Sequence, residues 1–146
     1  MPWDGNIYTI IQSGGQIEMT PSKLLSRQDL KNGLVLEFWD LSRPLTGDRW
    51  QVVVEVRVAI PVTPANLPPD LKGQQDQVIA VLGTEAVFTK QEVRNFVAEE
   101  QIPPLIDEVQ KQLLASLSGY LGHPEFAPRF IRKQFTDIKE RRNWSN

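Results

Sequence analysis

The sequence predicts an α+β fold in which an antiparallel sheet packs against C-terminal helices. Apolar residues alternate over residues 50–62, which is the period of a strand with one buried face. A second alternating run, at residues 34–38, is separated from the first by the turn-rich segment 42–48. The two runs should therefore form a long hairpin over about 34–62. Apolar residues recur every three or four positions over 105–121, as in an amphipathic helix.

The N-terminal segment predicts a small hairpin and then a short helix. Gly14-Gly15 lies between the β-prone runs 7–11 and 17–19, and glycine adopts the positive φ values of tight turns. Pro21-Ser22 is expected to open a helix over residues 23–31, which Asn32-Gly33 would end.

The register of the main hairpin follows from its pleat. The inner face is expected to carry Leu34, Leu36 and Phe38 together with the alternating series that begins at Trp50, because a slip of one residue would reverse the face. This register also places Glu37 near Arg57 on the opposite face, where unlike charges on neighbouring strands are favourable. The apolar alternation and the placement of the charges therefore predict the same register.

The middle of the chain predicts a loop, a strand and a helix. Residues 61–77 are rich in proline and are expected to form a long loop. A strand is expected near 78–88, with a bulge or a close backbone approach at Gly83. The sequence from Thr89 to Glu92 matches a capping box, which predicts a helix over 90–99.

Two further helices are expected at the C-terminal end. Pro103 and Pro104 suit the first turn of the helix that contains the 105–121 repeat, and Gly122 and Pro124 should end it. The last helix should begin at Ala127 or Pro128 and run toward Arg141. Its inward side is expected to hold four apolar residues, Phe130, Ile131, Phe135 and Ile138.

Composition limits the class of protein. The chain has 146 residues, 40% of them hydrophobic and 23% charged, which fits one globular domain over residues 1–146. The formal net charge of -2 gives no general attraction to nucleic acid or anionic lipid. The absence of cysteine excludes disulfides and thiolate chemistry. We find neither a signal peptide nor a membrane span in the sequence, and we expect a cytoplasmic protein.

No pattern of residues predicts a catalytic, metal or cofactor site, and no cofactor is expected. The single histidine, His123, lies between Gly122 and Pro124, where a capping role is natural. The acidic pairs at residues 99–100 and 107–108 are adjacent in sequence, so their side chains diverge on a helix. Four oxygen-bearing residues around the hairpin loop match no calcium loop: Asp40, Ser42, Thr46 and Asp48. Ser42 and Asp48 are better explained as turn formers.

The outer face of the predicted sheet suggests an interaction surface. It should mix charged residues with a set of apolar ones, namely Val35, Trp39, Leu41, Val53, Ala59, Ile79, Val81 and Val87. Apolar patches of this kind mark contacts between proteins, unless the N-terminal hairpin or a helix covers them within the chain. The predicted partner-binding residues are Trp39, Leu41, Val53 and Arg57, and the leading hypothesis is a non-enzymatic domain that forms a homo-oligomer or binds a protein partner.

The C-terminal helix supplies an alternative. It carries a basic set that would bind nucleic acid or another anionic surface, namely Arg129, Arg132, Lys133, Arg141 and Arg142. Aromatic residues alternate with these cations at Phe126, Phe130, Phe135 and Trp144. The simpler interpretation is a solvated helix face whose aromatic side packs on the sheet. A small enzyme with no recognisable motif is the remaining hypothesis.

Overall fold

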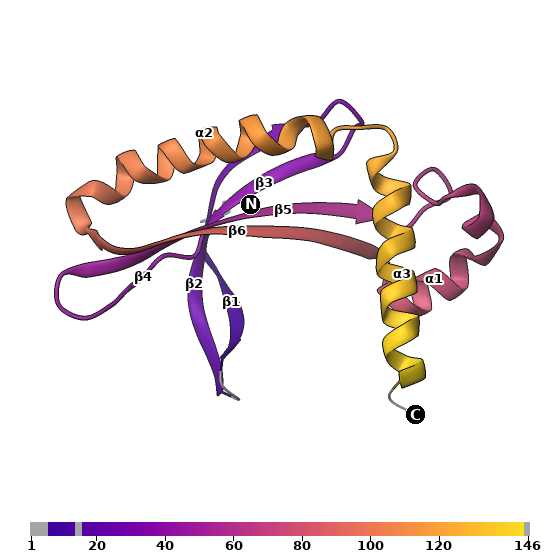
Figure 1. Cartoon of the computed structure of the whole chain (residues 1–146), viewed down its shortest axis with the longest axis horizontal. Helices are drawn as coiled ribbons and strands as arrows, with labels where there is room; N and C mark the ends of the chain where they lie inside the picture. The colour runs from indigo at the N-terminus through magenta and orange to yellow at the C-terminus, as the bar shows by residue number, and fades with distance from the viewer. Residues whose placement is uncertain (1–5, 14–15, 145–146) are drawn as a thin grey trace.

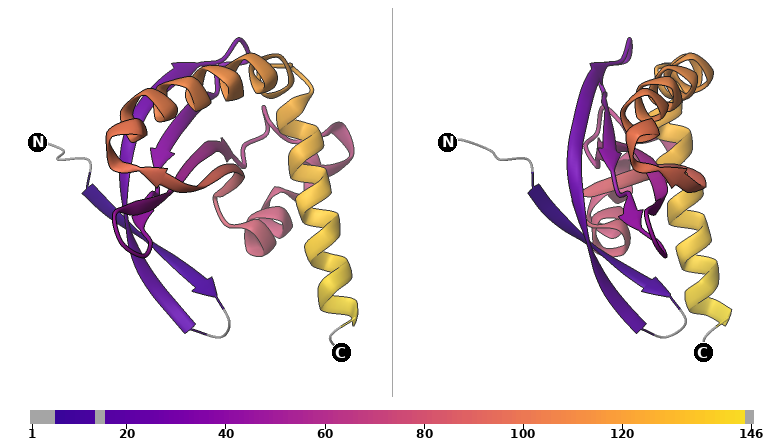
Figure 2. Two further views of the ribbon diagram at one scale, coloured as in Figure 1. Left: turned by 60° about the vertical axis from the view of Figure 1, so that its left-hand side comes forward. Right: turned by 90° about the vertical axis from the view of Figure 1, so that its left-hand side faces the viewer.

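The fold is an antiparallel sheet with helices on one of its faces, as the sequence predicts (Figure 1). The computed structural model describes the backbone of residues 6–13 and 16–144 and the side chains of residues 22–142. Within these residues the sheet is six-stranded, with the order β1-β2-β3-β5-β4, and β6 pairs with β5. The turned views of Figure 2 show the long strand β2 on one side of the molecule and helices α2 and α3 on the other.

Five strands lie before residue 62, β6 follows after the first helical segments, and helices dominate the last third of the chain. The strands are β1 (Asn6–Ser13), β2 (Gln16–Asp29), β3 (Val35–Asp40), β4 (Arg43–Pro44), β5 (Arg49–Pro61) and β6 (Glu85–Ala98). The helical segments are η1 (Pro69–Gln74), α1 (Gln75–Leu82), η2 (Glu99–Gln101), α2 (Ile102–Leu121) and α3 (Phe126–Trp144).

The predicted long hairpin and its register are confirmed by the pairing of β3 with β5. Leu36 lies opposite Val58, and Glu37 lies opposite Arg57. The alternate valines of β5 are buried in the main core with Leu36 and Phe38. We call this side the inner face, because residues of α1, α2 and α3 belong to the same core. The short strand β4 lies in the connection between β3 and β5 and pairs with the start of β5.

The helix predicted over residues 23–31 is wrong, because β2 continues as a strand to Asp29. Its second half pairs with β3, with Leu24 opposite Trp39, and this pairing outweighs the local helix signal. Pro21 lies opposite Tyr8 on β1, and the pairing of β2 with β3 begins only at Lys23. At Pro21 the strand therefore has a neighbour on one side only, and proline is tolerated at such edge positions. The predicted hairpin of residues 7–11 and 17–19 is confirmed as β1 and β2, whereas its Gly14-Gly15 turn lies outside the described residues.

The strand predicted near 78–88 is correct only from Glu85 onward. Residues 75–82 form α1, which turns the buried Val78 into the main core, with Ile79 and Val81 packed against it. Ile79 and Val81 are therefore absent from the outer sheet face on which they were expected. Gly83 has φ 84° and ends the helix, its N–H donating to the carbonyl of Ile79 at 2.7 Å, so it is a helix cap and forms no strand bulge.

The helix predicted over residues 90–99 is also wrong. The segment belongs to β6, which follows β5 from the Pro61–Glu85 pair to the Arg49–Ala98 pair. Thr89 and Glu92 thus lie in a strand and form no capping box. The local motif is overridden because β6 supplies a partner for nearly the whole of β5.

The proline-rich segment 61–77 contains η1 and leads into α1, and it is part of the core. Val62, Leu67 and Leu71 are all buried. The last two helices are confirmed with bounds close to those predicted, and Ile131 and Phe135 of α3 are buried as expected. They meet β6 at an aromatic cluster, where Phe88 makes edge contacts with three rings, those of Tyr120, Phe126 and Phe130.

Candidate functional site

The outer face of the sheet carries a small apolar cluster of its own. Trp39, Leu41 and Val53 form this cluster, and Leu24 of β2 packs against it. No described helical residue belongs to it. The three side chains are only 4%, 2% and 7% exposed, so their own chain covers them. The sequence left open whether these outer-face residues are exposed or covered within the chain, and the structure shows that they are covered. The cluster therefore lies beneath the surface of the outer face.

Polar side chains hold Trp39 in place. The indole Nε1–H donates to Glu37 Oε1 at 3.2 Å, and Arg27 donates to the other oxygen of Glu37 at 3.0 Å. The guanidinium of Arg57 lies 4.6 Å from the centre of the indole ring, which is within the range of a cation–π contact. Arg57 is half-buried and contacts Trp39, so the structure places Arg57 beside the cluster of Trp39, Leu41 and Val53.

A buried carboxylate completes this network. Glu55 is 8% exposed, and it accepts hydrogen bonds from Arg57 Nε and, at 3.1 Å, from Gln91 Nε2. Arg57 therefore joins β5 to the Trp39 ring, while Gln91 joins β5 to β6. A carboxylate with two donors is satisfied within its own chain. These hydrogen bonds therefore stabilise the observed arrangement of side chains at the centre of the outer face.

Around this centre the outer face exposes apolar side chains. Val35 on β3 is 38% exposed, and Val87 and Val93 on β6 are 51% and 39% exposed. Val87 lies opposite the exposed Ala59, and Val93 lies opposite Val53 of the apolar cluster. We call Val35, Ala59, Val87 and Val93 the outer apolar set. Sequence reasoning found three of these residues but missed Val93, because it assigned that segment to a helix.

Strand β6 ends in an irregular segment with an exposed aromatic ring. Its register against β5 shifts between Trp50 and Val52, so that Asn95 and Phe96 together oppose Gln51. Gln51 donates a side-chain hydrogen bond to Asn95 at 2.9 Å. Phe96 has φ 58° and is 70% exposed. A large residue in the left-handed region is strained, and such bulges often occur at functional positions.

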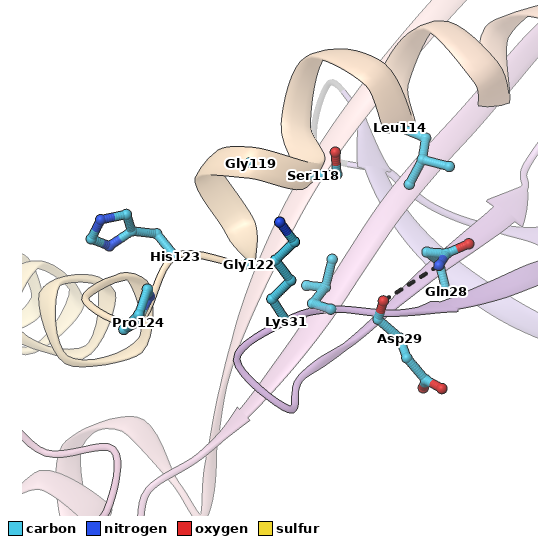
Figure 3. A pocket seen from close by; sticks show the side chains of 10 residues that line it. Gln28, Asp29, Lys31, Leu114, Ser118, Gly119, Gly122, His123 and Pro124 are labelled. Carbon is cyan, nitrogen blue, oxygen red and sulfur yellow. Dashed lines mark hydrogen bonds between the residues drawn. The ribbon is translucent and has the colours of Figure 1, made fainter.

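A pocket of about 570 Å³ lies where the β2–β3 turn meets the end of α2 (Figure 3). Lys31, Ser118 and His123 are among its lining residues. The ring of His123 points away from Lys31 in Figure 3, and its Nδ1 accepts a hydrogen bond from the Glu125 N–H at 3.0 Å. His123 thus closes the turn between α2 and α3. The pocket residues share no hydrogen bond that would make His123 a general base, and the geometry is that of a structural joint.

The basic residues of α3 do not converge on one site. Arg132 forms an ion pair with Asp70 of η1. Arg129, Lys133, Arg141 and Arg142 are exposed, and Arg141 has a contact of its own. The aromatic residues Phe126, Phe130 and Phe135 face the core, whereas the side chain of Trp144 lies outside the described residues. The described aromatic rings of α3 thus belong to the core, whereas its basic side chains are on the exposed side of the helix.

Asp40 and Ser42 bind backbone groups at the end of β3. Asp40 Oδ1 accepts a hydrogen bond from the Ser42 N–H at 2.9 Å, and Ser42 Oγ accepts one from the Val53 N–H at 3.1 Å. Over the described part of the chain, no group of three or more His, Asp or Glu side chains is placed to hold a metal ion.

No family model, no curated protein and no solved structure matches this chain. Among the described helices, none is long and apolar enough to cross a membrane. The function is therefore inferred from the residues and their geometry.

Proposed function

We propose that this chain is a non-enzymatic interaction domain that associates with a second copy of itself through the helix-free side of its sheet. The supporting observation is the asymmetry of the sheet. The inner face shares one core with the helices, whereas the outer face exposes Val35, Val87 and Val93 around an ordered centre. Apolar groups left in water beside a rigid surface favour contact with another protein.

The buried cluster of Trp39, Leu41 and Val53 holds the exposed side chains of the outer face in position. Because Trp39, Leu41 and Val53 are buried and tied to Glu37 and Arg57, the outer face is organised before any partner arrives. Such preorganisation lowers the entropy lost on binding. The residues that would touch a partner are therefore the exposed outer apolar set, and the cluster positions them.

Sedimentation velocity over a range of concentrations tests the proposal. The wild-type protein should sediment increasingly as a dimer as concentration rises. Replacing Val87 and Val93 by Asp puts charge on exposed positions and should shift the protein toward monomer without loss of helix or strand signal. The matched control is Ala115→Asp, which puts the same charge on an exposed position of α2 and should leave association unchanged.

A wild-type protein that remains monomeric at every concentration contradicts the proposal. The same holds if Val87→Asp and Val93→Asp leave the dimer as stable as Ala115→Asp does.

Anion binding by α3 is the alternative function, and the geometry supports it less well. Arg132 already has Asp70 as a partner, and the Lys139 ammonium lies 4.9 Å from the centre of the Phe135 ring. The exposed Arg129 and Lys133 are one helical turn apart and are the residues available to an anionic surface. Salt-sensitive retention on heparin that Arg129→Glu and Lys133→Glu abolish would favour this alternative.

A further inference from the structure

The outer edge of β6 lacks a partner strand within the described residues. β6 is 14 residues long and pairs with β5 alone. An open edge presents backbone N–H and C=O groups that can pair with another strand. Natural edges are blunted by proline, by charged side chains or by bulges. β6 contains no proline between Glu85 and Ala98, its bulge lies near its C-terminal end, and its charged residues Lys90, Glu92 and Arg94 are of both signs. Its long open edge is thus suited to pairing with another chain.

The charges on β6 are self-complementary in one antiparallel register. Opposed side chains in an antiparallel pair share a face, so a two-fold axis between identical strands passes through a residue that faces its own copy. With the axis at Gln91, Lys90 of each copy lies opposite Glu92 of the other. This register therefore forms two pairs of opposite charge. On the other face it places Thr89 opposite Val93, a favourable pair of β-branched residues.

Neighbouring registers are less favourable. An axis at Lys90 or at Glu92 sets that residue against its own charge, and the latter also sets Lys90 against Arg94. An axis at Val93 brings the irregular Asn95–Phe96 segment into the pairing, because it would lie opposite Gln91 and Lys90. The axis at Gln91 instead uses the regular segment from Phe88 to Arg94 and stops before the bulge. The bulge and the charge order select the same register.

We infer that two copies of this chain form a two-fold dimer by pairing β6 with β6 in antiparallel fashion about Gln91, which joins their sheets into one. This inference rests on the proposed self-association, and it places the contact at the β6 edge of the sheet, beside Val87 and Val93 of the outer apolar set. The two outer faces then lie side by side, with Val93 of each copy against Thr89 of the other. The β6 edge is removed from water, which accounts for its lack of proline.

A charge-swap experiment tests the register. Lys90→Glu and Glu92→Lys should each weaken dimerisation about ten-fold or more, because each creates two like-charged pairs across the axis. A mixture of the two variants should restore it, since each introduced charge then faces its opposite and the native Lys90 and Glu92 still face each other. Lys90 is exposed, whereas Glu92 is half-buried and forms an ion pair with Arg94 of its own strand, so circular dichroism and the unfolding midpoint must first show that both variants fold. Lys111→Glu, an exposed change on α2, is the matched control.

Disulfide trapping separates the register from self-association itself. The chain has no cysteine, so Gln91→Cys supplies a single thiol. Opposed residues at the axis have Cα atoms about 4.5–5.5 Å apart, which a disulfide spans. Gln91→Cys should therefore cross-link to itself on mild oxidation. Thr89→Cys should not cross-link alone but should do so when mixed with Val93→Cys.

The outcomes distinguish the two proposals. Suppose that the protein dimerises in sedimentation, that the Gln91→Cys variant fails to cross-link, and that mixing does not rescue the charge variants. This result overturns the β6 register and leaves self-association standing. A protein that never dimerises overturns both proposals. Restored dimerisation in the mixture, together with cross-linking of the Gln91→Cys variant, supports both.

Discussion

At the residue scale, Trp39 illustrates how far the sequence defines this site. Alternation placed Trp39, Leu41 and Val53 on the outer face, and the structure finds them together there. Alternation alone does not tell how deeply a side chain is covered. Arg57, Glu37 and Leu24 all contact the Trp39 cluster, and Arg57 and Leu24 are brought there by the pairing of β3 with β5 and with β2. The sequence therefore predicts the face of the sheet on which Trp39 lies, but it does not predict how deeply Trp39 is buried.

Gly122 marks another position where a single residue controls the fold. A Cβ atom at Gly122 would lie 2.9 Å from the Ser118 carbonyl oxygen and 3.4 Å from the Lys31 backbone nitrogen. Gly122→Ala should therefore lower the free energy of unfolding by roughly 1–3 kcal/mol, because backbone must move to relieve the contact. Urea denaturation measures this change.

Gly119 gives the matched control for that substitution. It lies in the same helix, and a Cβ atom there would meet nothing within 4 Å. Gly119→Ala should stabilise the protein by up to about 1 kcal/mol, because alanine is the better helix former. Equal effects at both glycines would contradict the expected clash of a Cβ atom at Gly122 with the Ser118 carbonyl and the Lys31 backbone.

At the scale of elements, β6 shows where a local signal fails. The Thr89 and Glu92 spacing fits a helix start, and no nearby residue contradicts it. The segment becomes a strand because it pairs with β5, residues Arg49–Pro61. This pairing is non-local, so the residues around Thr89 do not reveal it. The same non-local pairing turns residues 23–29 into β2. The helices α2 and α3 were predictable because their periodicity is long and self-contained.

Thr89→Val tests the assignment of this segment as a strand. In β6 the Thr89 hydroxyl caps no helix, and valine suits an exposed strand at least as well as threonine. The free energy of unfolding, measured where the protein is monomeric, should change by less than about 0.5 kcal/mol. A capping residue would behave differently, since removing its hydroxyl typically costs about 0.5–2 kcal/mol. A loss in that range would contradict the strand.

At the scale of the whole molecule, the proposed self-association depends on the two unlike sides of one sheet. The helices and the proline-rich segment complete the inner core, so the apolar side chains of the inner face are buried within the chain. The outer side keeps the outer apolar set exposed, and among the described residues no strand pairs with the far edge of β6. Val87 and Val93 of that set belong to β6 itself, so a second copy paired at this edge would contact Val93.

Hydrogen–deuterium exchange at low and high protein concentration tests this claim most directly. The account predicts that backbone amides of residues 88–94 gain protection as concentration rises, because pairing with a second copy covers the β6 edge. Amides of α2 and α3 should exchange at the same rate in both samples. Concentration-dependent protection confined to α2 or α3, or no change in β6 between samples, would contradict the account.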